Sequence, residues 1–116
     1  MSLKVKTRML DSVVIVDLEG RLTSGEPQLM LRETIRRLIN EGNRKFVLNL
    51  TDVSYIDSSG LGEFAATRCS LTKIGGEVNL VGLTNRVTDL MVMTHLALEF
   101  DSFDEESKAV LALTRA

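Results

Sequence analysis

The 116-residue chain has few of the residues that usually carry covalent or redox chemistry. It contains one cysteine, one histidine and no tryptophan. A single cysteine cannot form an internal disulfide, and the first residues lack the cationic start and apolar stretch of a signal peptide. No apolar run approaches the roughly 20 residues that cross a bilayer. These absences predict a cytoplasmic protein that is not inserted in a membrane.

Charges of the two signs nearly balance. Fourteen Lys and Arg against sixteen Asp and Glu give a formal net charge of -2, and there is no basic run or aromatic cluster on which bases could stack. This composition argues against nucleic acid as the main ligand and favours a protein partner. With 44% apolar residues the chain can fill one core, so we expect a single domain over residues 1–116. Residues 1–3 have the composition of a remnant of cloning.

Hydrophobic periodicity predicts strands that alternate with helices. A period-two pattern indicates a half-buried edge strand at the start of the chain, and a continuous β-branched run then indicates a strand covered on both faces. The strands are predicted over residues 3–9, 13–18, 45–50, 78–81 and 98–100, and the helices from the turn at 23–27 to 40, over 58–74, over 85–94 and after 104. This order predicts an α/β fold with a mixed, mostly parallel five-stranded sheet and about four helices.

The sequence predicts specific contacts or positions for a few side chains. Thr23 or Ser24 is expected to cap the first helix, in which Glu33 lies one turn before Arg37 and is placed to form an ion pair with it. Cys69 has a spacing compatible with the inner face of the second helix, which favours inert packing over redox chemistry.

The run Asp57-Ser58-Ser59-Gly60-Leu61 follows an apolar strand and opens the second predicted helix. The first turn of a helix presents unpaired N–H groups and a partial positive charge, so a serine there can cap the helix, bind an anion or carry a phosphate. As a plain cap, Ser58 or Ser59 would accept a helix N–H, and Gly60 would allow close packing. Only a phosphate would make the run a switch.

Catalytic and cofactor chemistry match the sequence poorly. A hydrolase nucleophile elbow needs glycine two residues before the serine, whereas Ser58 has Ile56 there, and His95 is expected to be a partly exposed helix-end residue. Gly60-x-Gly62 lacks the third glycine of a dinucleotide fingerprint. The acidic residues between 101 and 106 lack the spacing of a calcium loop. We therefore predict no catalytic residue, metal or cofactor, and a small serine hydrolase using Ser58 is the remote alternative.

Four segments carry a wider pattern. They are Val-Leu-Asn-Leu-Thr-Asp-Val-Ser-Tyr-Ile-Asp-Ser-Ser-Gly-Leu-Gly at 47–62, Lys-Ile-Gly-Gly-Glu-Val-Asn-Leu at 73–80, Gly-Arg-Leu at 20–22 and Val-Thr-Asp-Leu at 87–90. At these spacings the chain closely resembles the STAS domains of bacterial anti-sigma factor antagonists over nearly its whole length. The resemblance implies that Ser58 is phosphorylated by a partner that is both anti-sigma factor and serine kinase. It also implies that unmodified protein binds this kinase and frees a sigma factor, and that a separate phosphatase resets Ser58.

The resemblance also implies a partner-binding surface and contains one departure. The surface comprises Asp57, Ser58, Ser59, Gly60, Leu61 and Thr23, with Ser59 as the second choice of phosphate acceptor. Phosphorylated members commonly carry aspartate where this chain has Thr23. The departure leaves open an alternative with the same fold, which is a non-switched scaffold or an accessory subunit of a stress-signalling or lipid-transport complex.

Overall fold

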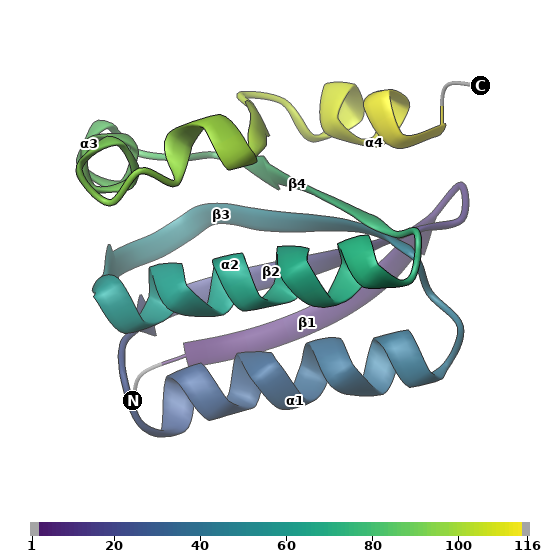
Figure 1. The fold of residues 1–116 in the computed structure, drawn as a ribbon, viewed down its shortest axis with the longest axis horizontal. Helices are drawn as coiled ribbons and strands as arrows, with labels where there is room; N and C mark the ends of the chain where they lie inside the picture. The colour runs from purple at the N-terminus through teal and green to yellow at the C-terminus, as the bar shows by residue number, and fades with distance from the viewer. Residues whose placement is uncertain (1–2, 115–116) are drawn as a thin grey trace.

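The computed structural model describes residues 3–114, in which five strands form one sheet in the order β1-β2-β3-β4-β5 (Figure 1). The strands are β1 Leu3–Leu10, β2 Val13–Leu22, β3 Lys45–Ile56, β4 Glu77–Val81 and β5 Asp101–Phe103. The first pair is antiparallel, and the other three pairs are parallel. The predicted mixed, mostly parallel sheet is confirmed, with β1 at its edge. Residues 1–2 of the supposed cloning remnant lie outside the described residues, whereas Leu3 is buried in β1.

Helices cover both faces of this sheet. They are α1 Glu26–Asn40, α2 Ser58–Lys73, α3 Asn85–Met93 and α4 Glu106–Thr114, with the short 3-10 helix η1 Ala97–Glu99 after α3. Each parallel strand lies beside the one before it, so crossovers of the same hand bring α1, α2 and α3 to one face. Most buried apolar residues of these three helices belong to the larger core cluster, and the buried residues of α4 belong to a smaller cluster on the opposite face. Figure 1 shows α4 on the side of the sheet away from α1.

The two clusters explain the continuous apolar run in β2. Val14 and Val16 point into the larger cluster, and Val13 and Ile15 point into the smaller one beneath α4. Successive side chains of a strand face opposite sides, so a strand covered on both faces needs apolar residues at every position. The prediction that this strand is covered on both faces is confirmed.

Three strands differ from their predicted ranges by more than one residue. β2 runs four residues past its predicted end at Leu18, to Leu22. β3 runs six residues past the predicted end at Leu50. The continuous apolar run stops at Leu50 because the second half of β3 has only one covered face, where Val53 and Ile56 are buried while Ser54 is exposed. The predicted strand over residues 98–100 is wrong, since η1 lies there and β5 follows it. β5 is an edge strand that hydrogen bonds β4 alone, and edge pairing needs little apolar sequence.

The expected details of α1 are also wrong. Its N-cap is Gly25, which has no side chain to cap the helix, and the carbonyl of Thr23 accepts a hydrogen bond from the Gln28 N–H instead. The positive φ of 91° at Gly25 is the conformation that glycine adopts without strain. Arg37 forms its ion pair with Glu41 at 3.2 Å, one turn later, rather than with Glu33. Both spacings fit one helical turn, so sequence cannot choose between them.

Cys69 is exposed on α2, so its predicted place on the inner face is wrong. The buried apolar residues of α2 are Leu61, Phe64 and Leu71. Residue 69 is two positions before Leu71, a spacing that places it on a different side of a helix with 3.6 residues per turn.

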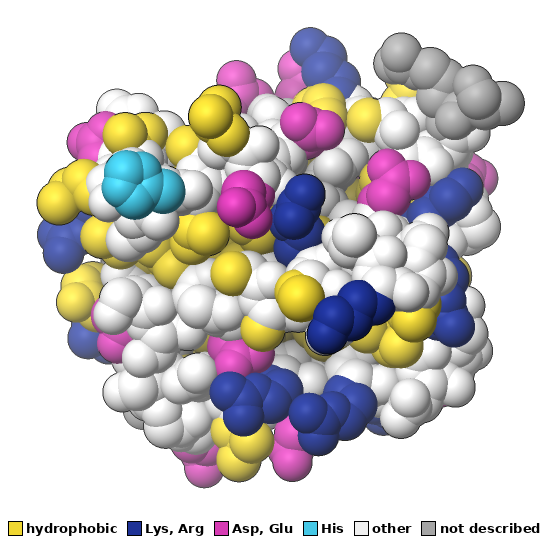
Figure 2. Space-filling view, in the orientation of Figure 1, with side chains coloured by type: hydrophobic (Ala, Val, Ile, Leu, Met, Phe, Trp, Pro, Cys, Tyr) yellow, Lys and Arg dark blue, Asp and Glu magenta, His cyan; other side chains and the backbone are white. Residues whose placement is uncertain are grey.

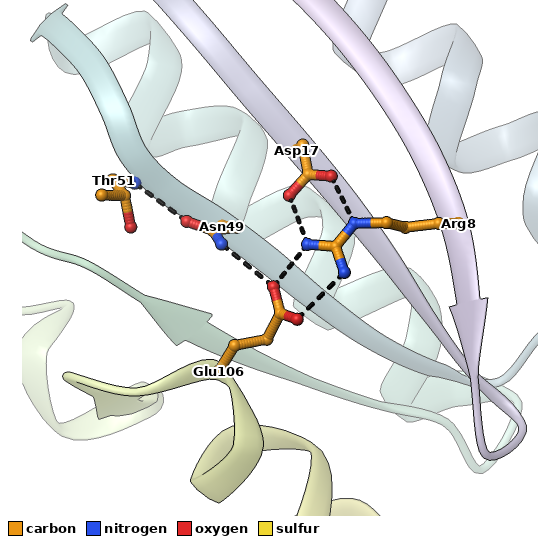
Figure 3. Close-up of polar contacts among 5 residues, drawn as sticks. All are labelled: Arg8, Asp17, Asn49, Thr51 and Glu106. Carbon is orange, nitrogen blue, oxygen red and sulfur yellow. Dashed lines mark hydrogen bonds and ion pairs between the residues drawn. The ribbon is translucent and has the colours of Figure 1, made fainter.

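A polar network fastens α4 to the sheet (Figure 3). Arg8 of β1 donates to Asp17 of β2 at 2.7 Å and to Glu106 of α4 at 3.0 Å. Asn49 of β3 donates from its amide nitrogen to Glu106 at 3.1 Å, and its amide oxygen accepts from the Thr51 N–H at 3.0 Å. One carboxylate thereby joins the start of α4 to side chains from β1 and β3.

Candidate functional site

Asp57 is the residue that caps α2. Its backbone is extended, and its Oδ1 accepts hydrogen bonds from the N–H groups of Ser59 at 2.9 Å and Gly60 at 3.1 Å. The alternative in which Ser58 or Ser59 caps the helix is wrong. The side chain before the first helical residue reaches the second and third N–H groups, and that position belongs to Asp57.

The two serines that follow Asp57 differ in exposure. Ser58 is the first residue of α2 and is exposed, whereas Ser59 is half-buried. Within residues 3–114, neither hydroxyl takes part in a protein hydrogen bond. Leu61, one helical turn after Asp57, is 1% exposed and packs in the larger core cluster, so its side chain lies inside the domain and not on the exposed part of the predicted partner-binding surface.

The loop between β2 and α1 lies against the start of α2. The backbone N–H of Asp57 donates to the carbonyl of Leu22 at 3.3 Å, and the second carboxylate oxygen of Asp57 lies 3.4 Å from the Ser24 N–H nitrogen. These contacts bring Thr23, which is half-buried, close to Asp57. Thr23 thus lies between the two residues that contact Asp57, the residue directly before Ser58.

Gly60 permits this close approach because it has no Cβ. A Cβ there would lie 2.8 Å from the carbonyl oxygen of Leu22 and 2.6 Å from a side-chain carbon of Ile56, and both distances are shorter than real contacts. At Gly62 a Cβ would meet nothing within 4 Å. Gly60 is therefore needed for packing, whereas Gly62 leaves an open surface one turn from Ser58.

Glu63 joins α1 to α2 and was not identified from the sequence. It is 3% exposed, and one of its oxygens accepts from Gln28 at 3.1 Å and from Arg32 at 2.6 Å. The hydrogen bond from Arg32 to Glu63 raises the pKa of that guanidinium. A glutamate beside Gly62 looks like a surface residue, and only the packing of α1 shows that it is buried.

Tyr55 makes cation–π contacts with two arginines. This feature was not identified from the sequence. The guanidinium carbon of Arg21 lies 4.6 Å from the ring centroid, and that of Arg86 lies 5.3 Å from it. Arg21 is the register partner of Tyr55 on β2, whereas Arg86 comes from the first turn of α3. The sequence offered one signal, the Gly-Arg-Leu segment that contains Arg21.

Hydrolytic chemistry receives no support from this geometry. Within residues 3–114, no hydrogen bond joins Ser58 to His95, which is exposed just after α3. The same part of the chain contains no group of three or more His, Cys, Asp or Glu residues placed to hold a metal ion. None of the helices described between residues 3 and 114 is long and apolar enough to cross a bilayer.

The comparison with protein families decides the family. The STAS domain profile matches residues 4–109, which is nearly the whole chain. The chain belongs to the STAS domain family. A curated relative, the anti-sigma-B factor antagonist of Staphylococcus aureus, is 32% identical over 97 residues, which are 83% of this chain and 88% of that protein.

Two solved structures have the same fold. A Thermotoga maritima protein described as a candidate anti-sigma factor antagonist superposes with a TM-score of 0.89 at 27% identity, over 96% of this chain and 95% of that one. The phosphorylated form of SpoIIAA, a Bacillus cell fate determinant, superposes with a TM-score of 0.73 at 20% identity, over 92% and 96%. Both likenesses support the fold predicted from the sequence.

Proposed function

We propose that this chain is an anti-sigma factor antagonist that works by partner switching. Unmodified protein binds an anti-sigma factor that is also a serine kinase, and a sigma factor is thereby released. Phosphorylation of Ser58 ends the binding, and a phosphatase restores it. The relative named an anti-sigma-B factor antagonist supports the class, and no catalytic step is assigned to this chain.

The exposure of Ser58 is the observation that carries this proposal. Asp57 already satisfies two N–H groups of the first turn of α2, so the Ser58 hydroxyl is not needed as a cap. A kinase can reach an exposed hydroxyl without unfolding the helix. Ser59 is half-buried, which supports Ser58 as the first choice of acceptor and Ser59 as the second.

A phosphate on Ser58 would change the surface far more than the fold. It adds about 1.5 to 2 negative charges and three acceptor oxygens. The positive end of the α2 dipole offsets part of the cost to the domain. A partner that approaches Asp57 with carboxylates, or that buries Ser58, would be repelled. Local charge thus becomes a binary signal in the cytoplasm, where the kinase, phosphatase and sigma factor meet.

Substitution of Ser58 tests the proposal. We expect Ser58→Asp to weaken binding to the anti-sigma factor kinase at least tenfold, while Ser58→Ala retains binding and accepts no phosphate. Ser70→Asp is the matched control, since Ser70 is exposed on the same helix at its far end. Isothermal titration calorimetry with the purified kinase measures each affinity. Equal affinities for the wild type and Ser58→Asp would refute the switch.

Thr23 favours a second candidate, a non-switched scaffold or accessory subunit of the same fold. Thr23 lies in the loop that contacts Asp57, so a missing carboxylate there changes the immediate setting of Ser58. Under this candidate, Ser58→Ala and Ser58→Asp both bind the partner as the wild type does. Under the switch, Thr23→Asp is expected to raise the rate of phosphorylation by the kinase.

A further inference from the structure

Three side chains from separate elements meet near Ser58. Tyr55 lies near the end of β3, Arg21 lies opposite it on β2, and Arg86 reaches the same ring from α3. Ser58 follows Tyr55 by three positions, and an extended chain spans at most about 3.6 Å per residue, so this cluster and Ser58 share one edge of the domain. We call these three side chains the arginine–tyrosine cluster.

The two arginines of the cluster have no acidic partner within the described residues. Both are exposed, and neither forms an ion pair there. Other arginines of the chain do pair with carboxylates, namely Arg8, Arg32, Arg37 and Arg68. The arginine–tyrosine cluster therefore holds two exposed guanidinium groups with no carboxylate within ion-pair distance in the described residues.

The two positive charges of the cluster have unfavourable electrostatic interactions in the isolated domain. Both guanidinium groups lie near one ring centroid, so their separation is no more than about 10 Å, comparable to the Debye length at physiological salt. Arg86 also occupies the first turn of α3, where the helix dipole disfavours a positive charge. An anion that binds both groups would relieve both conflicts.

We propose that the arginine–tyrosine cluster binds a carboxylate-bearing segment of the protein partner. Guanidinium groups pair with carboxylates through two parallel hydrogen bonds, and the Tyr55 ring holds both groups in place by cation–π contact. An acidic segment held there would lie beside Ser58, so a phosphate on Ser58 would repel it. The identity of this partner rests on the proposed function, whereas the site itself rests on the cluster alone.

A peptide titration tests the site without any kinase. Nitrogen-15 labelled protein is titrated with a hexaglutamate peptide, and the Nε–H signals of Arg21 and Arg86 are followed by NMR. We expect saturable shifts at both signals that weaken at least fivefold when salt rises from 50 to 200 mM. A hexaglutamine peptide and inorganic phosphate are the comparison ligands, and neither is expected to match hexaglutamate.

Neutral variants locate the binding. Arg21→Gln and Arg86→Gln are each expected to weaken hexaglutamate binding at least threefold. Arg36→Gln is the matched control, because Arg36 is exposed in the second half of α1, away from the loop between β2 and α1, and it should bind as the wild type does. The site is refuted if no saturable shift occurs, if Arg36→Gln weakens binding equally, or if phosphate binds and hexaglutamate does not.

Failure here differs from failure of the proposed function. The peptide titration involves neither phosphorylation nor the anti-sigma factor, so a negative result removes the arginine–tyrosine cluster and leaves the Ser58 switch standing. Conversely, a kinase that binds Ser58→Asp normally removes the switch and leaves the peptide result intact.

Discussion

At the scale of single residues, Asp57 organises the site more than either serine does. One of its oxygens caps α2, and the other faces the Ser24 N–H of the preceding loop. Because Asp57 takes the capping role, the Ser58 hydroxyl is left exposed at the helix start. An aspartate directly before the serine therefore has a structural reason as well as an electrostatic one.

Removal of the Asp57 carboxylate should loosen the start of α2. We expect Asp57→Ala to lower the free energy of unfolding by about 1 to 2 kcal/mol, the usual cost of losing a helix cap. Urea denaturation followed by circular dichroism measures the loss. Ser59→Ala is the control and should change the free energy by less than about 0.5 kcal/mol, because the half-buried Ser59 hydroxyl takes part in no protein hydrogen bond within residues 3–114. A larger loss for Ser59→Ala than for Asp57→Ala would contradict this assignment of the cap.

The two glycines of α2 should respond oppositely to the same substitution. Gly60→Ala places a methyl group against the Leu22 carbonyl and Ile56, so we expect a loss of about 1 to 3 kcal/mol in unfolding free energy. Gly62→Ala meets open space and should raise it by about 0.5 to 1 kcal/mol, because alanine favours the helix. Thermal melts of the two variants give the comparison. Stabilisation by Gly60→Ala would show that α2 does not pack as described.

At the scale of elements, polar contacts link helices to their neighbours in addition to apolar packing. Glu63 bonds α2 to Arg32 of α1, and Glu106 bonds α4 to Arg8 of β1. The first contact couples α1 to the helix that carries Ser58. The second lies on the opposite face of the sheet and gives α4 a fixed register.

The Glu106 network predicts a specific pH dependence. Hydrogen bonds from Arg8, and secondarily from Asn49, lower the pKa of Glu106 against the opposing effect of burial. A lowered folded pKa gives stability that is full above the unfolded value of about 4.5 and is lost as pH falls through the lower folded value. Because Arg8 is half-exposed, we expect Glu106→Gln to cost only about 1 kcal/mol at pH 7.

The same variant should approach the wild type in acid. Urea denaturation at pH 7, 5, 4 and 3 is expected to show the difference shrinking below pH 5. Glu105→Gln is the control, since Glu105 is exposed and contacts Lys108 at 3.7 Å, and it should change stability by less than about 0.5 kcal/mol at every pH. A Glu106→Gln deficit that persists at pH 3 would contradict a role for the ionised carboxylate.

The elements differ in how far sequence predicts them. β2 was predictable because its apolar run reflects burial on both faces, and α2 because Gly75 and Gly76 end it clearly. β5 was not, because an edge strand of three residues depends on the backbone of β4 rather than on its own side chains. The end of β3 was underestimated because its outward residues become polar where one face is uncovered.

At the scale of the whole molecule, charges of the two signs nearly balance, with a formal net charge of -2. Figure 2 shows acidic and basic side chains interspersed over one face, with apolar side chains gathered at the end where α3 lies. A phosphate on Ser58 would therefore act locally and would not alter a global field. We expect the melting temperature of Ser58→Asp to stay within about 2 °C of the wild type, measured by calorimetry, because surface substitutions seldom change stability by more than 0.5 kcal/mol. A drop of 5 °C or more would mean that the charge acts through unfolding.

The site as a whole was only partly within reach of sequence. The run at 57–61 predicted the helix start, but which residue caps it depends on where the first helical turn begins, a matter of one position. Glu63 and the arginine–tyrosine cluster join residues that are 31 or more positions apart, so no local pattern could reveal them. Long-range contacts of this kind follow only from the three-dimensional packing.

The most direct test of the proposed switch is the modification state of the protein in its native cells. The chain is isolated with phosphatases inhibited under several growth and stress conditions, and the peptide that contains Ser58 and Ser59 is mapped by mass spectrometry. We predict phosphate on Ser58 in a fraction that changes with condition. Phosphate confined to Ser59, or a peptide that is unmodified under every condition, would contradict Ser58 as the switch.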